Sequence, residues 1–138
     1  MGVSVKVGSI ATEVGASSFL NAFFSTVAVL LEDDQPGKRF PTISHDFYQG
    51  QVDAEQVAQA IDELKRIQAE LAKHPPTAVV WDREDRTLRP PWGEKISSHI
   101  TSMTNYFVTS SGRDLMGVLL EVFDHALKTK KAVEIAEI

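Results

Sequence analysis

Three carboxylates within four residues are the strongest candidate for chemistry in this sequence. Asp82, Glu84 and Asp85 follow an apolar run, and carboxylate oxygens are the ligands that divalent cations prefer. Three arginines lie between and after these carboxylates and would neutralise them locally. No Glu-x-Lys motif of a metal nuclease follows on a neighbouring predicted strand. We therefore expect first a solvated or ion-paired loop, second a protein-contact surface, and last a catalytic site.

The remaining polar residues show no pattern typical of an enzyme. The four histidines, His45, His74, His99 and His125, are never four residues apart, so no helical zinc pair is present. There is no Gly-x-Ser-x-Gly elbow and no glycine-rich phosphate loop. The absence of cysteine excludes disulfides and thiolate metal sites. The sequence predicts no metal site, no cofactor and no catalytic residue. A small hydrolase that combines the three carboxylates with His99 is the alternative.

Two tryptophans flank the acidic segment. Trp81 ends the apolar run at residues 77–81 and is expected in the core. Trp92 follows two prolines and precedes a glycine, so it lies in a loop. It either covers the core as a lid or stands partly exposed as a binding anchor, since tryptophan is enriched at interface hot spots. The predicted contact surface comprises Asp82, Glu84, Asp85, Trp92 and Glu94.

The charge balance favours a basic protein partner. The formal net charge is −5, and opposite fields accelerate the encounter of two proteins. Basic residues cluster only at Lys128, Lys130 and Lys131, too small a patch to predict nucleic-acid binding. The most apolar stretch, residues 19–31, is shorter than the ~20 residues of a membrane span. The N-terminal segment does not read as a secretory signal, so we expect a cytoplasmic protein.

Hydrophobic periodicity predicts three main helices. The first, at residues 17–32, has a wide apolar face that other elements must cover. The second runs from a capping box at Asp53 and Gln56 to about Lys73. The third starts at a similar motif, Ser111 with Asp114, and ends near Lys128. All three are expected to pack against a sheet.

Strands are predicted at residues 3–7, 77–81, 105–109 and 132–138, with a weaker one at 40–43. Gly15 is expected to break the chain before the first helix. The result is one α+β domain over residues 1–138, with a single mixed sheet of about four to five strands packed against three main helices. If the last strand forms an exposed sheet edge, a regulatory module that homodimerises there is a further alternative.

Several short motifs, spread over nearly the whole chain, resemble one known family. They are Val-Val-Trp-Asp at 79–82, Pro-Pro-Trp-Gly at 90–93, Asn-Tyr-Phe-Val-Thr-Ser at 105–110, Gly-Arg-Asp-Leu at 112–115, and the opening residues 5–10 with 17–20. Together they resemble the immunity protein 70 family of bacterial polymorphic toxin systems. The resemblance implies a small cytoplasmic protein that binds and neutralises a cognate toxin domain, without a cofactor or catalytic residues. Many such toxins are basic nucleases, which agrees with the acidic balance.

Overall fold

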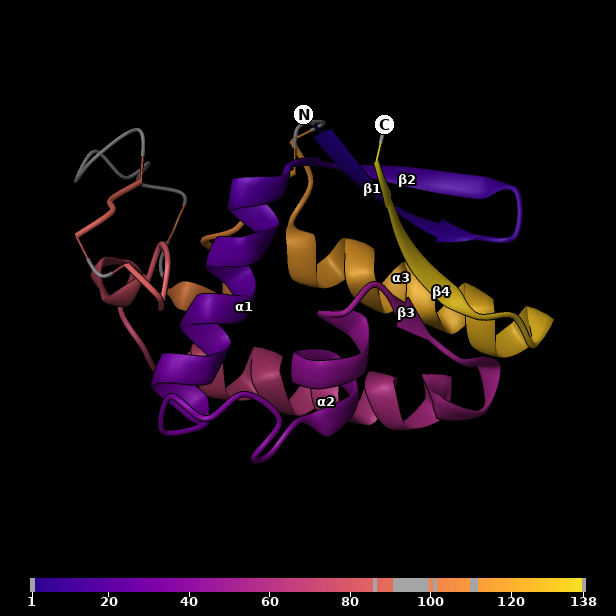
Figure 1. Ribbon diagram of the computed structural model, residues 1–138, viewed down its shortest axis with the longest axis horizontal. Coiled ribbons are helices and arrows are strands. Elements are labelled where there is room, and N and C mark those ends of the chain that lie inside the picture. The colour runs from indigo at the N-terminus through magenta and orange to yellow at the C-terminus, as the bar shows by residue number, and fades with distance from the viewer. Residues whose placement is uncertain (1, 86, 91–99, 101, 110–111, 138) are drawn as a thin grey trace.

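The computed structural model describes residues 2–85, 87–90, 100, 102–109 and 112–137. Its strands are β1 (Gly2–Val7), β2 (Ile10–Ala16), β3 (Gln51–Val52) and β4 (Val133–Glu137), and its main helices are α1 (Ser17–Leu31), α2 (Val57–Leu71) and α3 (Leu115–Thr129). A short π-helix, η1 (Thr42–Phe47), lies between α1 and α2. The predicted α+β class, with one sheet and three main helices, is confirmed (Figure 1).

The sheet has the strand order β2-β1-β4-β3. All three pairings are antiparallel, in place of the mix of directions expected. β4 lies inside the sheet, between β1 and β3, so the exposed edge that the homodimerising alternative requires is not formed by this strand. The strand β2 was not predicted, because Gly15 was interpreted as a break. Instead, the turn comes earlier, at Gly8, whose φ of 60° suits glycine in a tight hairpin.

The segment at residues 77–81, predicted to be a central strand, is not part of the sheet. It consists of a 3-10 turn (Pro76–Ala78) and irregular chain. The hydroxyl of Thr26 in α1 donates to the carbonyl of Val80 and accepts from its amide, both at 3.1 Å. A side chain therefore provides the hydrogen bonds that a neighbouring strand would have provided, and Val80 is buried against a helix.

The strands predicted at residues 40–43 and 105–109 are also wrong. Residues 40–43 lead into η1, and residues 105–109 contribute only an isolated bridge between Val108 and Asp114. The predicted start of α3 with Ser111 as the cap is three residues too early, because the helix begins at Leu115 and its N-cap is Asp114, whose carboxylate accepts from the amide of Gly117. The predicted capping box at Asp53 and Gln56 is also wrong, because α2 is entered through a 3-10 turn (Ala54–Gln56) without a side-chain cap.

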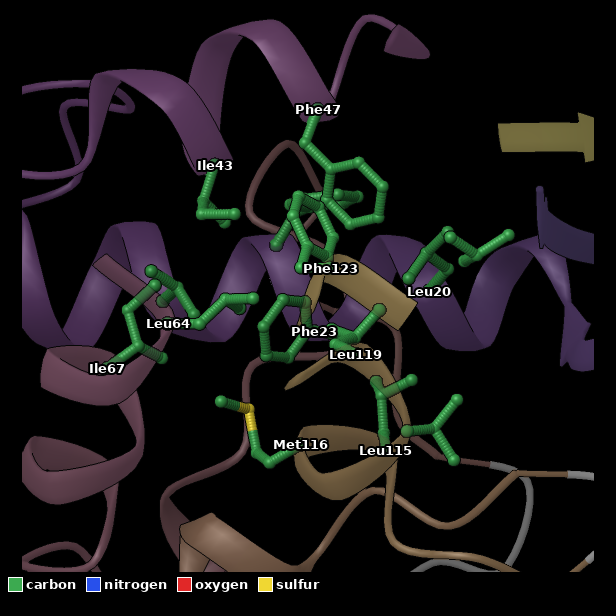
Figure 2. Packing of buried hydrophobic residues seen from close by; sticks show 14 of the residues in the cluster. Leu20, Phe23, Ile43, Phe47, Leu64, Ile67, Leu115, Met116, Leu119 and Phe123 are labelled. Carbon is green, nitrogen blue, oxygen red and sulfur yellow. The ribbon is translucent and has the colours of Figure 1, made fainter. Parts of the chain in front are cut away.

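The core forms where α1, α2, α3 and η1 meet (Figure 2). The predicted helices α2 and α3 each bury an apolar face in this core. Phe47 of η1 packs edge-to-face on Phe24 and Phe123, with ring centroids 5.6 and 5.2 Å away, an arrangement that aromatic rings prefer. Trp81, expected fully in the core, is only partly buried and packs against its margin.

A buried carboxylate fixes the chain that follows α1. Glu32 is 0% exposed. It accepts hydrogen bonds from the backbone amides of Gly37, Arg39 and Phe40 at 2.9, 3.0 and 3.1 Å, and from the hydroxyl of Ser44. A buried charge is tolerated only when such partners replace water. Glu32 thereby folds the segment back on the end of α1.

A second carboxylate holds the start of η1 from the opposite side. Glu63 of α2 is 3% exposed and accepts from the amides of Thr42 at 3.3 Å and Ile43 at 2.9 Å. These amides belong to the first turn of η1, where backbone donors lack partners within the helix. Glu32 and Glu63 therefore place η1 between α1 and α2.

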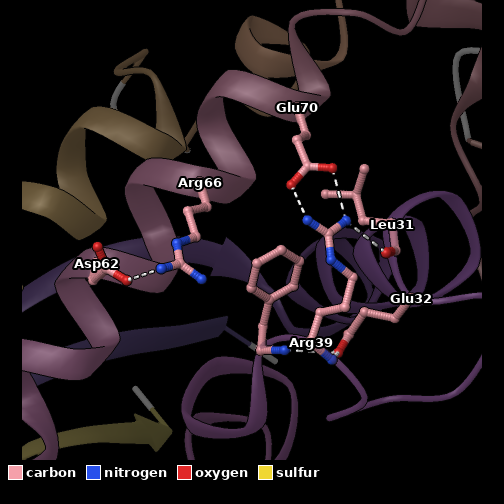
Figure 3. A network of polar contacts seen from close by, with 7 residues as sticks. Leu31, Glu32, Arg39, Asp62, Arg66 and Glu70 are labelled. Carbon is pink, nitrogen blue, oxygen red and sulfur yellow. Dashed lines mark hydrogen bonds and ion pairs between the residues drawn. The ribbon is translucent and has the colours of Figure 1, made fainter.

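Arg39 joins the same segment to α2 at the surface (Figure 3). Its guanidinium donates to both carboxylate oxygens of Glu70, one at 2.7 Å, and to the carbonyl of Leu31 at 3.0 Å. It also lies over the ring of Phe40, 4.9 Å from the centroid. The hydrogen bond from Arg39 lowers the pKa of the Glu70 carboxyl below its ordinary value.

Replacing Glu32 with alanine is expected to lower the free energy of unfolding by about 3–5 kcal/mol, because one buried amide, two partly buried amides and a buried hydroxyl lose their acceptor. Glu55→Ala, at an exposed position, is the matched control and is expected to cost less than about 1 kcal/mol. Urea denaturation measures both. Equal losses would show that the Glu32 contacts do not stabilise the fold.

The Arg39–Glu70 pair is expected to make stability depend on pH. Because the folded-state pKa of Glu70 is lowered, its contribution is present above the ordinary glutamate pKa and is lost as pH falls through the folded-state value. Glu70→Gln should therefore cost up to about 1 kcal/mol at pH 7, as for partly exposed pairs, and close to nothing near pH 2. Asp62→Asn removes the helical pair with Arg66 and should cost less than about 0.5 kcal/mol at pH 7. A Glu70→Gln loss that stays constant with pH would contradict this reading.

Candidate functional site

The predicted contact residues divide into two groups. Asp82, Glu84 and Asp85 are described by the structure. Trp92 and Glu94 lie outside the described residues, as does His99 of the hydrolase alternative. The choice between lid and anchor for Trp92 therefore stays a prediction.

Residues 80–85, which carry the three carboxylates and which we call the acidic loop, are attached to α1 by polar side chains. In addition to the two bonds between Thr26 and Val80, the hydroxyl of Ser25 accepts from the backbone amide of Arg83 at 3.1 Å. Both hydroxyl residues are buried. In the sequence, Ser25 and Thr26 interrupt the apolar residues of the first predicted helix. Because buried hydroxyls need hydrogen-bond partners, these two positions indicate that another segment of the chain bonds to this helix.

Arg83 does not neutralise the carboxylates of its own loop. Its guanidinium donates to the carboxylate of Asp34 at 2.9 Å and to the carbonyl of the same residue at 3.2 Å. Asp34 lies in the turn after α1, so this ion pair crosses from one loop to another. The prediction that basic neighbours pair with the acidic cluster is wrong for Arg83.

Each of the three carboxylates therefore has a different environment. Asp82 accepts from the backbone amide of Glu84 at 2.9 Å. Asp85 accepts from the hydroxyl and amide of Thr87, and these bonds lower its pKa. The side chain of Glu84 is exposed and makes no hydrogen bond or ion pair with any residue that the structure describes. Glu84 and Asp85 are exposed and Asp82 is partly exposed, so a partner can reach all three residues.

A pocket of about 120 Å³ lies beside this loop, and we call it the Tyr48 pocket. It is lined by Asn21, Phe24, Ser25, Pro36, Ser44, Tyr48, Asp82, Arg83 and Glu84. These residues come from α1, the turn after it, η1 with the residue that follows it, and the acidic loop. Only Asp82 and Glu84 were predicted as site residues. Tyr48 was missed because no local pattern connects it with positions distant in the sequence.

The ring of Tyr48 forms an exposed aromatic wall of the Tyr48 pocket. The residue is 52% exposed. Its ring stands edge-to-face on Phe24 with a centroid distance of 5.2 Å and an interplanar angle of 86°. Phe24 in turn packs on Phe47 of η1. The aromatic wall is therefore supported from the core and projects from it to the surface.

The size of the Tyr48 pocket suits a single side chain. Sites for small-molecule substrates usually have volumes of about 300–1,000 Å³. Within the described ranges, no group of three or more His, Asp or Glu side chains is arranged to hold a metal ion.

Residues 5–135 match the family described as immunity protein 70. The chain belongs to the immunity protein 70 family. The resemblance inferred from the motifs is therefore confirmed. No match is found among curated proteins or among solved structures.

In this immunity-family protein, the matched region contains all of the elements described above except the first three residues of β1 and the last two of β4. It includes the acidic loop and every residue of the Tyr48 pocket. Among the described residues, no helix is both long and apolar enough to cross a membrane.

Replacing Thr26 with valine is expected to release the acidic loop from α1. The isosteric change leaves both buried backbone groups of Val80 unpaired and should lower the free energy of unfolding by about 1–3 kcal/mol. Hydrogen exchange should accelerate at the amides of Val80 and Arg83 more than within α3. Thr129→Val, which removes an exposed hydroxyl bonded to the carbonyl of His125, is the control. Equal effects of the two variants would show that Thr26 does not anchor the loop.

Proposed function

We propose that this protein binds a cognate toxin domain and neutralises it, protecting the cell that makes both. Membership of the immunity protein 70 family is the observation that carries the proposal. The protein acts by binding, without catalysis, metal or cofactor, and it acts in the cytoplasm.

The acidic loop and the Tyr48 pocket form the contact surface in this proposal. Asp82, Glu84 and Asp85 come first along the chain, and Trp92 and Glu94 complete the surface. Bonds from Thr26 and Ser25 hold the backbone of the loop at Val80 and Arg83, which supports a surface formed before the partner arrives. Less ordering on binding means a smaller loss of conformational entropy.

The toxin domain is basic in this proposal. The net charge of −5 and the two exposed carboxylates of Glu84 and Asp85 support this choice. Rim charges of this kind mainly increase the association rate, which can approach ~10⁸ M⁻¹s⁻¹ at low salt. A standard interface buries roughly 1,200–2,000 Å² in total, so the partner must also cover surface beyond the loop.

Neutralisation is tested by co-expression. The toxin domain encoded beside this gene should stop growth when it is expressed alone and should be tolerated when this protein is co-expressed. A 1:1 complex should be recovered from the same cells. If the cells are not protected, or the two proteins do not bind, the proposed function is wrong.

Reversing the charge of the acidic loop is expected to slow association with that toxin domain by about tenfold or more at low salt, because the attraction that guides encounter becomes repulsion. The variant is Glu84→Lys with Asp85→Lys, measured by a biosensor over a series of salt concentrations. Glu55→Lys with Glu137→Lys changes the net charge equally at two distant exposed positions and should slow association less. Equal slowing by both variants would indicate that the association rate depends on the net charge of the protein and not on the charges of the acidic loop.

A further inference from the structure

We propose that the Tyr48 pocket receives a lysine or arginine side chain of the bound toxin domain. This inference rests on the proposed function, because it takes the toxin domain as the partner. It adds the position of an anchor and the chemistry of the residue that fills it.

The aromatic lining of the pocket suits a cation with an apolar stem. Phe24 and Pro36 line the pocket together with Tyr48, and the methylene groups of lysine or arginine pack well on such surfaces. A cationic head within about 6 Å of a tyrosine or phenylalanine ring centroid is attracted by the ring face. The exposed ring of Tyr48 is placed to provide this contact.

The polar lining of the pocket offers acceptors for the same cation. The carboxylates of Asp82 and Glu84 lie at one side, and Glu84 has no partner among the described residues. The side-chain amide of Asn21 has no partner there either. Lysine and arginine carry only donors, so every one of these oxygens is complementary to them.

Arg83 also lines the pocket and would repel a second cation if its charge were free. Its guanidinium, however, is hydrogen-bonded to the carboxylate and the carbonyl of Asp34. The charged groups that line or adjoin the pocket are then one cation and the three carboxylates of Asp34, Asp82 and Glu84. An excess of negative charge remains for an incoming side chain.

The walls of the pocket are held in place by the buried network. The hydroxyl of Ser44 donates to Glu32, which also fixes the amide of Gly37 next to Pro36. Phe24 packs on Phe47 in the core. A pocket with fixed walls loses little conformational entropy on binding, which is the condition for an effective anchor site.

The pocket can be tested without the toxin by three small probes on the intact protein. They are N-acetyl-arginine amide, N-acetyl-lysine amide and, as an uncharged control of similar length, N-acetyl-norleucine amide. In nitrogen-15 NMR titrations, the two cationic probes should shift the amides of Tyr48, Arg83 and Glu84 and saturate in the millimolar range. The norleucine probe should bind at least tenfold more weakly. Equal binding of all three probes would overturn the proposal.

Variants assign the binding to named groups. Glu84→Gln and Tyr48→Leu should each weaken arginine-amide binding at least fivefold. Tyr48→Phe keeps the ring and should bind nearly as well as the wild type. Glu55→Gln, outside the pocket, should have no effect. If Glu84→Gln and Tyr48→Leu also have no effect while remaining folded by thermal unfolding, the pocket does not bind cations.

Dissociation of the toxin complex distinguishes failure of the pocket assignment from failure of the proposed function. Tyr48→Leu and Glu84→Gln should each accelerate dissociation of the toxin complex about tenfold, since loss of an anchor acts mainly on dissociation. If the wild type neutralises the toxin and both variants dissociate at its rate, the pocket assignment is wrong and the proposed function stands. If the pocket binds arginine amide but the wild type does not bind the toxin, the toxin is not its partner and both proposals fail.

Discussion

A carboxylate without access to solvent lies at the end of α1 and accepts four hydrogen bonds from the chain that follows it. Those bonds to Glu32 come from three backbone amides and the Ser44 hydroxyl, and they turn the chain back toward the helices. Glu63 holds the next turn from α2. Between them, η1 carries Ile43 and Phe47 into the centre of the core, and the fold depends on both carboxylates being fully bonded.

The Tyr48 pocket and the acidic loop also depend on the bonds that Glu32 and Glu63 accept. Once η1 is fixed, Tyr48 follows it directly and stands on Phe24 at the surface. On α1, Ser25 and Thr26 hold the acidic loop against the helix next to that ring. The aromatic wall and the carboxylates thus meet because two segments are bonded to the same helix.

Much of the fold could be predicted from local patterns. Helices α2 and α3 and strands β1 and β4 are predicted from the periodicity of neighbouring residues, and the structure confirms that these elements form. The apolar run at residues 77–81 was wrongly predicted as a strand, because its length and composition suit a buried strand. In the structure Val80 of this run is bonded instead to the Thr26 hydroxyl, 54 residues earlier in the chain.

The candidate site was only half predictable for a similar reason. Asp82 and Glu84 stand out because carboxylates in a short loop form a local pattern. Tyr48 and Asn21 do not, since they join the pocket only when η1 and α1 are brought together by the buried glutamates. The family could be recognised from motifs, and the match over residues 5–135 confirms it.

Hydrogen exchange of the complex with the neighbouring toxin domain tests most directly where the partner binds. Compared with the free protein, exchange is expected to slow at residues 79–85, at Tyr48 and in the turn at Asp34, with little change along β2. Slowing along the free edge of β2 or the outer face of α3, with none at residues 79–85 and Tyr48, would contradict the account.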